Sequence, residues 1–155
     1  MNKIIVAIDL QEHTEIVINK AVEVAEKFEA ELHLVHVVLP TSGYIAPTVT
    51  DPLGTIDPVM YPDGLEIIEI QRKNAEESMD KIVQNMTVKP AAAKIFIGDI
   101  EDEVVNYARE TGATMIVVGT HQRSGLSRLL NRETSVRILH ETQIPILVVP
   151  TKIEK

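Results

Sequence analysis

Met115-Ile116-Val117-Val118-Gly119 is the stretch of the sequence that best indicates the fold. It is short, apolar and rich in β-branched residues, and it ends at a glycine. This is the pattern of a strand buried on both faces of a parallel sheet. Similar runs recur along the chain and predict further strands of one sheet. These runs are Ile4–Ile8, Leu32–Val38, Ile146–Val149 and the shorter, weaker Lys94–Ile97.

Segments in which apolar residues recur with helical spacing lie between these runs. The first segment repeats at i, i+3, i+4 and i+7, which predicts a helix directly after the first strand. The third has acidic residues in its first turn, Glu101–Glu103, and ends at Gly112. Alternating strands and helices are typical of βαβ units and predict a parallel sheet. The markers of the four helices are Ile18, Ala21, Val22 and Ala25; Ile68, Ala75, Met79, Ile82 and Met86; Val104, Val105 and Ala108; and Val136 and Leu139.

The length and composition predict one domain spanning residues 1–155. A chain of 155 residues that is 45% hydrophobic is long enough to bury a substantial core. Leu39–Gly64 breaks the alternation with scattered prolines and glycines, so we expect a long loop at about 39–64. Such a loop is either a lid over a site or a disordered segment, and the sequence leaves both open.

The charge and the missing cysteines limit the function. The formal net charge is −8, which disfavours a nucleic-acid partner and favours a small ligand or a protein partner. The absence of cysteine excludes disulfides, thiolate metal sites and cysteine nucleophiles. The first apolar run is too short for a signal core, and no run approaches the roughly 18 apolar residues of a membrane span. We therefore expect a cytoplasmic protein without membrane insertion.

The carboxyl ends of the strands are the expected location of a site, because helix N-termini present free N–H groups there. The segment after the fourth strand is the most informative, since it carries Arg123, Arg128 and Arg132 and no acidic residue. Arginines beside glycine and serine would suit an anion such as phosphate. A solvated basic loop is the other interpretation. The strand ends supply Asp9; Val37 and Val38; Gly98 and Asp99; and Gly119, Thr120, His121 and Gln122.

Five motifs occur in a fixed order along the chain: Lys3–Leu10, Leu34–Val37, Gly98–Ile100, Gly119–His121 followed by Arg123–Leu130, and Pro145–Pro150. Together they resemble the universal stress protein family over essentially the whole length. The resemblance implies an α/β fold, an open five-stranded parallel sheet with helices on both faces. This fold is Rossmann-like and adenine nucleotide alpha hydrolase-like, with strand order 3-2-1-4-5.

The resemblance also implies a homodimer paired through the last strand, residues 146–149. An apolar edge strand needs such a partner or coverage by its own loops. In one branch of the family it implies an ATP site with the pattern Gly-x2-Gly-x9-Gly-Ser/Thr, whose small residues let the backbone wrap the phosphates. Gly119 matches the first glycine of that pattern.

The other three positions of the ATP pattern are occupied by Gln122, Arg132 and Glu133. Gln122 and Arg132 add side chains where the backbone would approach phosphate, and Glu133 adds a negative charge. Two like charges about 4 Å apart repel by roughly 4 kcal/mol at an effective dielectric near 20. We therefore expect the branch that does not bind ATP tightly, with Glu133 itself in the anion position beside Arg132 or Arg128.

An adenine half-site is expected to persist, because the resemblance places Asp9 near the ribose and adenine with Ala7 and Val37 beside it. The other interpretation of Asp9 is a carboxylate that caps the turn after the first strand. The expected function is a non-enzymatic binding or signalling module of the stress response with no required cofactor. The alternative is a member that binds ATP or AMP through residues 119–134. The candidate binding residues are Ala7, Asp9, Val37, Gly119, Thr120, His121, Gln122, Arg123, Arg132, Glu133 and Thr134.

Two other classes of function receive less support. Asp9, Asp99, Thr120 and Lys152 follow strands as in a phosphoacceptor receiver, but Asp9 stands without the second acid that Mg²⁺ requires there. The five histidines lack a helical i, i+4 pair, and His33 and His36 would face opposite sides of one strand, so no metal site is expected. No hydrolase elbow, Walker loop or dinucleotide-binding turn is present.

Overall fold

The computed structural model describes residues 2–40, 64–120 and 134–151, and strands and helices alternate throughout these ranges. Each strand and helix predicted from the sequence is present, with β3 beginning two residues earlier than expected. Residues 41–63 of the predicted long loop lie outside the described residues, while Gly64 already belongs to a helix. The elements are β1 (Lys3–Ala7), α1 (Thr14–Phe28), β2 (Glu31–Val38), α2 (Gly64–Asn85), β3 (Ala92–Ile97), α3 (Ile100–Thr111), β4 (Met115–Thr120), α4 (Thr134–Glu141) and β5 (Ile146–Pro150).

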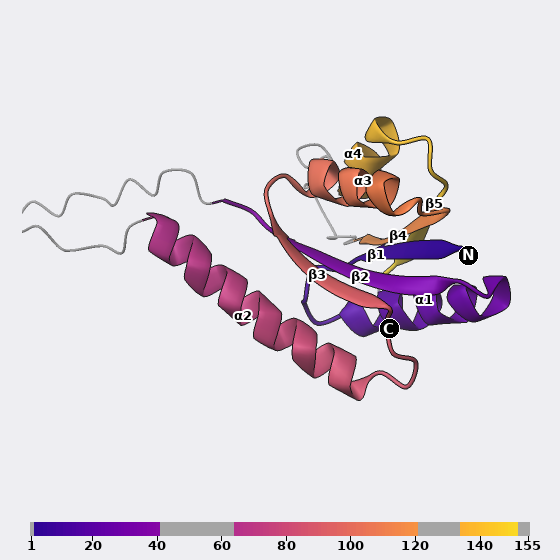
Figure 1. The fold of residues 1–155 in the computed structure, drawn as a ribbon, viewed down its shortest axis with the longest axis horizontal. Helices are drawn as coiled ribbons and strands as arrows, with labels where there is room; N and C mark the ends of the chain where they lie inside the picture. The colour runs from indigo at the N-terminus through magenta and orange to yellow at the C-terminus, as the bar shows by residue number, and fades with distance from the viewer. Residues whose placement is uncertain (1, 41–63, 121–133, 152–155) are drawn as a thin grey trace, which may run out of the picture.

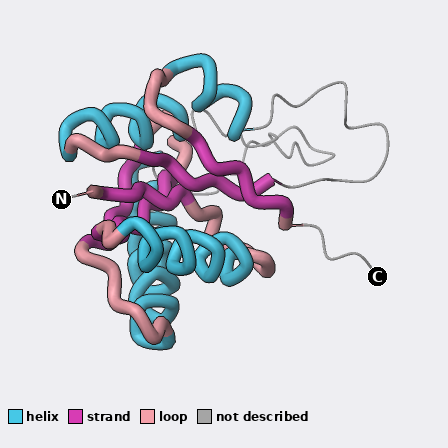
Figure 2. Tube along the Cα trace, turned by 90° about the vertical axis from the view of Figure 1, so that its right-hand side faces the viewer, coloured by secondary structure: helices cyan, strands magenta, loops and turns pink. Residues whose placement is uncertain are grey.

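The strands form one parallel sheet in the order β3-β2-β1-β4-β5, as the family resemblance implied. Ile5 of β1 pairs with His33 of β2 on one side and with Ile116 of β4 on the other. Figure 1 shows α1 and α2 on one face of the sheet and α3 and α4 on the other. Seen from the side in Figure 2, the twisted sheet lies between the two layers of helices.

The sheet has a separate apolar cluster on each face. Ile4 and Val6 of β1 pack with α1 and α2, whereas Ile5 packs with α3 and α4. Alternate residues of a strand point to opposite faces, so a strand covered on both faces needs apolar residues at consecutive positions. This is why the buried strands read as continuous apolar runs.

Two helices end with a residue in the left-handed conformation. Gly112 follows α3 with φ 66° and its N–H is bonded to Ala108 and Arg109 carbonyls, which confirms the predicted helix end. Glu29 ends α1 in the same conformation with φ 48°, although it is not a glycine. No residue type typical of such a helix end marks that second position in the sequence.

α4 differs from the expectation in its buried residue. Leu139, taken as a core marker, is 59% exposed, and its neighbour Ile138 is fully buried against α3 instead. The buried face of α4 is therefore offset by one residue from the predicted face. α4 packs mainly on α3 rather than directly on the sheet. Arg137 forms an ion pair with Glu101, and Arg109 Nη2 donates to the Glu141 carbonyl at 2.7 Å. These contacts hold α4 parallel to α3.

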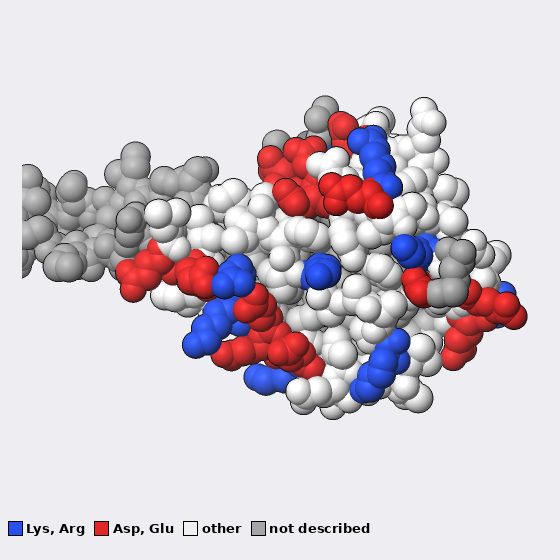
Figure 3. All heavy atoms as spheres, viewed as in Figure 1, with Lys and Arg blue, Asp and Glu red and all other residues white. Residues whose placement is uncertain are grey.

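Charged residues cover the outer helices. On the face seen in Figure 3, acidic side chains gather over α3 and along α2, and few charges lie between them. In α2, Arg72 is paired with both Glu69 and Glu76. The described residues on this face form no continuous basic stripe of the kind that binds nucleic acid.

Candidate functional site

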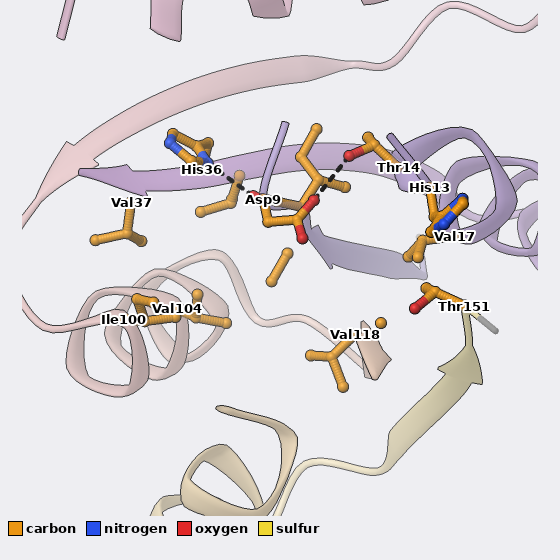
Figure 4. A pocket seen from close by; sticks show the side chains of 14 residues that line it. Asp9, His13, Thr14, Val17, His36, Val37, Ile100, Val104, Val118 and Thr151 are labelled. Carbon is orange, nitrogen blue, oxygen red and sulfur yellow. Dashed lines mark hydrogen bonds between the residues drawn. The ribbon is translucent and has the colours of Figure 1, made fainter. Parts of the chain in front are cut away.

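A cavity of about 120 Å³ lies at the carboxyl edge of the sheet, where β1, β2 and β4 end near the beginnings of α1 and α3. Four predicted residues, Ala7, Asp9, Val37 and Gly119, line this cavity together. Figure 4 shows their surroundings, with apolar side chains from α3 facing polar ones from α1. The other described lining residues are Ile8, His13, Thr14, Val17, Val35, His36, Ile100, Val104, Val118 and Thr151.

Asp9 lies in the turn that connects β1 with α1. Its Oδ1 accepts hydrogen bonds from the Gln11 N–H at 3.0 Å and from the Thr14 hydroxyl at 2.9 Å. The structure therefore gives Asp9 the turn-stabilising role that the sequence left open. The same residue also lines the cavity, so the two interpretations are compatible.

Four polar residues of the cavity were missed by sequence reasoning: His13, Thr14, His36 and Thr151. His13 and Thr14 stand at the beginning of α1, and Thr151 follows β5. Thr151 is buried, and both its hydroxyl and its N–H donate to the Thr120 carbonyl. The alternation of strands and helices could have placed these residues at the carboxyl edge, because every strand ends and every crossover helix begins there.

Gly119 has a packing role that the motif comparison did not reveal. A Cβ atom at this position would lie 2.8 Å from Val17 Cγ2 and 3.1 Å from Thr151 Cγ2. The missing side chain lets α1 and the end of β5 approach β4 closely. Packing therefore favours glycine at this position, whether or not a phosphate approaches.

Of the remaining predicted site residues, only Thr120 and Thr134 are among the described residues. His121, Gln122, Arg123, Arg132 and Glu133 lie outside the described residues. Thr134 is the first residue of α4, and Thr120 is buried at the end of β4. The cationic loop thus leaves β4 at the carboxyl edge and re-enters the structure at the N-terminus of α4.

The strand order argues against a receiver. Receivers have the flavodoxin-like order 2-1-3-4-5, in which the first and third strands are neighbours. Here β2 separates β1 from β3, and β3 is an edge strand, so Asp9 and Asp99 follow strands that are not adjacent. Lys152 lies outside the described residues.

Within residues 2–40, 64–120 and 134–151, no group of three or more histidine, aspartate or glutamate side chains is arranged to hold a metal ion. None of the described helices is both long and apolar enough to cross a bilayer.

The chain belongs to the universal stress protein family, whose model matches residues 1–150. Universal stress protein YxiE of Bacillus subtilis (strain 168) is 30% identical over 154 residues, covering 96% of this chain and 98% of the relative. These matches confirm the resemblance seen in the motifs.

Solved structures of the family share the fold. Universal stress protein UspA from Lactobacillus plantarum matches with a TM-score of 0.70 at 19% identity, covering 96% of this chain and 97% of that chain. The universal stress protein from Archaeoglobus fulgidus in complex with dAMP matches with a TM-score of 0.56 at 21% identity, covering 96% and 98%.

Proposed function

We propose that this universal stress protein is a non-enzymatic, cytoplasmic binding and signalling module of the stress response. Its carboxyl-edge cavity would bind the base and sugar of an adenine nucleotide, and the triphosphate group would not be bound tightly. The observation that carries this proposal is the convergence of Ala7, Asp9, Val37 and Gly119 on one cavity. The Archaeoglobus fulgidus relative solved with dAMP supports the ligand class.

The size and lining of the cavity suit the base of the nucleotide, and the sugar would extend out of the enclosed space past Asp9. The cavity volume of about 120 Å³ is close to the ~150 Å³ of an engineered protein cavity that binds benzene. Val37, Val104 and Val118 supply apolar surface for the faces of a base. Asp9 supplies a carboxylate that suits a sugar hydroxyl, because an ionised carboxylate accepts hydrogen bonds.

The phosphate part of the proposal rests on the sequence of the loop after β4. Gln122, Arg132 and Glu133 replace the small residues with which ATP-binding members wrap phosphate. In the proposed state, the Glu133 carboxylate takes the anion position and is neutralised by Arg132 or Arg128. Phosphate groups would then add little to the affinity.

Calorimetric titration with adenosine, AMP, ADP and ATP tests this proposal. We expect the four ligands to bind within about tenfold of one another, a span of ~1.4 kcal/mol. ATP binding that is a hundredfold or more tighter than adenosine binding would instead support the alternative, an ATP-binding member that uses residues 119–134. No binding of any of the four would reject the adenine site itself.

Two sets of variants sharpen the titration. Asp9→Asn should weaken adenosine binding, whereas Asp80→Asn, an exposed change on α2, should leave it unchanged. Replacing Gln122, Arg132 and Glu133 by Gly, Gly and Ser should selectively raise ATP affinity over adenosine affinity. A triple variant with unchanged ATP affinity would show that these three residues do not limit phosphate binding.

We also propose that a second copy of the chain pairs along β5. β5 is an edge strand, and its Val148 is 45% exposed. An apolar edge strand promotes association when it is unpaired.

Light scattering at micromolar concentration tests the pairing and should give a dimer for wild type. Val148→Lys should shift the protein to monomer, whereas the control Leu139→Lys on α4 should leave it dimeric. A wild-type monomer would contradict the pairing, leaving another protein as the expected partner.

A further inference from the structure

His36 of β2 bonds to the main chain at the point where β1 ends. The pairing of β1 with β2 ends at Ala7 and Val35. One residue later, the Ile8 N–H donates to the Val35 carbonyl at 2.9 Å. The Ile8 carbonyl lies 2.8 Å from His36 Nδ1. Because a carbonyl only accepts, Nδ1 carries the proton and donates it.

This hydrogen bond acts on the peptide group that precedes Asp9. The Ile8 carbonyl and the Asp9 nitrogen belong to one planar unit, which also contains the Cα atom of Asp9. Holding the oxygen of that unit therefore restricts where the Asp9 side chain begins. Figure 4 shows the His36 bond on one side of Asp9 and the Thr14 bond on the other.

The chain needs such an anchor because it turns sharply at this point. Leu10 adopts a left-handed conformation with φ 60°, which non-glycine residues seldom do. Residues in such conformations cost of order 1–3 kcal/mol and persist only where the surrounding contacts fix them. His36 fixes the peptide before Asp9, and Gln11 and Thr14 bind the carboxylate after the turn has begun.

We propose that His36 is a positioning residue for Asp9: its imidazole holds the Ile8–Asp9 peptide and thereby sets where the Asp9 carboxylate stands in the cavity. The inference rests on the proposed adenine site, in which Asp9 contacts the sugar. Neither the composition nor the motifs supply this role for His36. This role requires a hydrogen-bond donor at the δ position of the side chain at residue 36. It does not require that side chain to change its charge.

Two variants with the same functional group separate this role from general packing. In His36→Asn the amide nitrogen sits at the δ position and keeps a donor near the place of Nδ1. In His36→Gln the donor moves one bond further out. We expect adenosine affinity to stay within about threefold of wild type for His36→Asn and to fall about tenfold or more for His36→Gln. His140→Gln, an exposed change on α4, is the control.

A readout without ligand separates failure of this inference from failure of the proposed function. The NMR chemical shifts of the Asp9 and Leu10 amides and the titration of the Asp9 carboxyl should match wild type in His36→Asn and change in His36→Gln. If both variants leave these signals as in wild type, the positioning role is wrong even if adenosine binds. If the signals match wild type in His36→Asn and change in His36→Gln but wild type binds no adenosine, the positioning role stands and the adenine site is rejected.

A double-mutant cycle gives the second check. If His36 acts through Asp9, then His36→Gln should weaken adenosine binding much less in an Asp9→Asn background than in wild type. Full additivity of the two losses would mean that His36 affects the cavity by another route. Circular dichroism and the melting temperature of each variant show that it is folded before its affinity is interpreted.

Discussion

The two histidines of β2 show how differently the two ends of the sheet are built. His33, near the amino end, is buried, with Nδ1 at 2.9 Å from the Tyr107 hydroxyl and Nε2 at 3.8 Å from Glu31. His36, near the carboxyl end, binds a main-chain carbonyl beside the cavity. At His33, side-chain contacts hold the amino end of β2, whereas at His36 an imidazole holds the main chain beside the cavity. Along β2, contacts that hold α3 to the sheet are thus separate from the contact beside the candidate site.

The contacts of His33 define its tautomer. A carboxylate only accepts, so Glu31 favours the proton on Nε2 and leaves Nδ1 to accept from Tyr107. Tyr107 also packs against Phe96, with ring centroids 5.3 Å apart. This cluster joins α3 to β2 and β3, and it reaches from His33 near the amino end of β2 to Phe96, which pairs with Val37.

The largest expected effect comes from filling the space at Gly119. Gly119→Ala should lower the free energy of unfolding by about 1–3 kcal/mol, because the added methyl would overlap Val17 and Thr151. Chemical denaturation measures this loss. Combining it with Val17→Ala should cost less than the sum of the two single changes. Strict additivity would mean that the two side chains do not compete for this space.

A smaller loss is expected at the amino end, at Gly112. Its φ of 66° disfavours a side chain, although a Cβ there would meet no atom within 4 Å. Gly112→Ala should therefore cost about 1–2 kcal/mol through backbone strain alone, and Gly112→Asn should cost less. Equal losses for alanine and asparagine in denaturation experiments would contradict a conformational origin.

Removing the Tyr107 hydroxyl tests the side-chain contact of His33 near the amino end of β2. Tyr107→Phe deletes the hydrogen bond to His33 and keeps the ring packing on Phe96. We expect a loss of about 0.5–1.5 kcal/mol in unfolding free energy, the usual net value of one hydrogen bond. Adenosine affinity should not change, because Tyr107 is not among the cavity residues. A loss of adenosine affinity without a loss of unfolding free energy would show that Tyr107 contributes to the candidate site rather than to the stability of the fold.

The smallest expected effect is a pH dependence that arises from His33. Burial lowers the pKa of the His33 imidazole, with Glu31 opposing and Lys3 and Lys94 assisting this shift. The folded state therefore favours the neutral ring. Its contribution is complete above the unfolded pKa of about 6.5 and is lost as the pH falls through the folded pKa.

Denaturation curves between about pH 7 and pH 5 measure this contribution. We expect the stability of wild type to fall more steeply with decreasing pH than that of His33→Gln. His140→Gln, an exposed change, should follow wild type. Parallel curves for wild type and His33→Gln would show that His33 does not titrate differently on folding.

Much of the fold follows from sequence features that are local. The central strands β1, β2 and β4 were predictable because each is buried on both faces and so consists largely of consecutive apolar residues, as in Ile4–Ile8. The end of α3 was predictable because Gly112 is the residue type that a left-handed helix end favours. The buried face of α4 was predicted wrongly, because Leu139 was taken as a core marker and the packing against α3 buries Ile138 instead.

The candidate site was predictable only where its residues follow directly from the ends of strands. Ala7, Asp9, Val37 and Gly119 belong to motifs that the family resemblance marked, and the structure brings them together around one cavity. His13, Thr14 and Thr151 escaped notice because each is an ordinary polar residue in its local sequence. Their place in the cavity depends on how α1 and β5 pack beside β4.

The sequence by itself determined the alternation of strands and helices and the family, because the apolar pattern and motif order are properties of residues close together in the chain. Only the tertiary structure decided that Gly119 is needed for the approach of Val17 and Thr151. Only the tertiary structure placed the His36 imidazole on the carbonyl before Asp9. These contacts join residues 28 or more positions apart, and such proximity arises from parallel strand pairing, which no local pattern encodes.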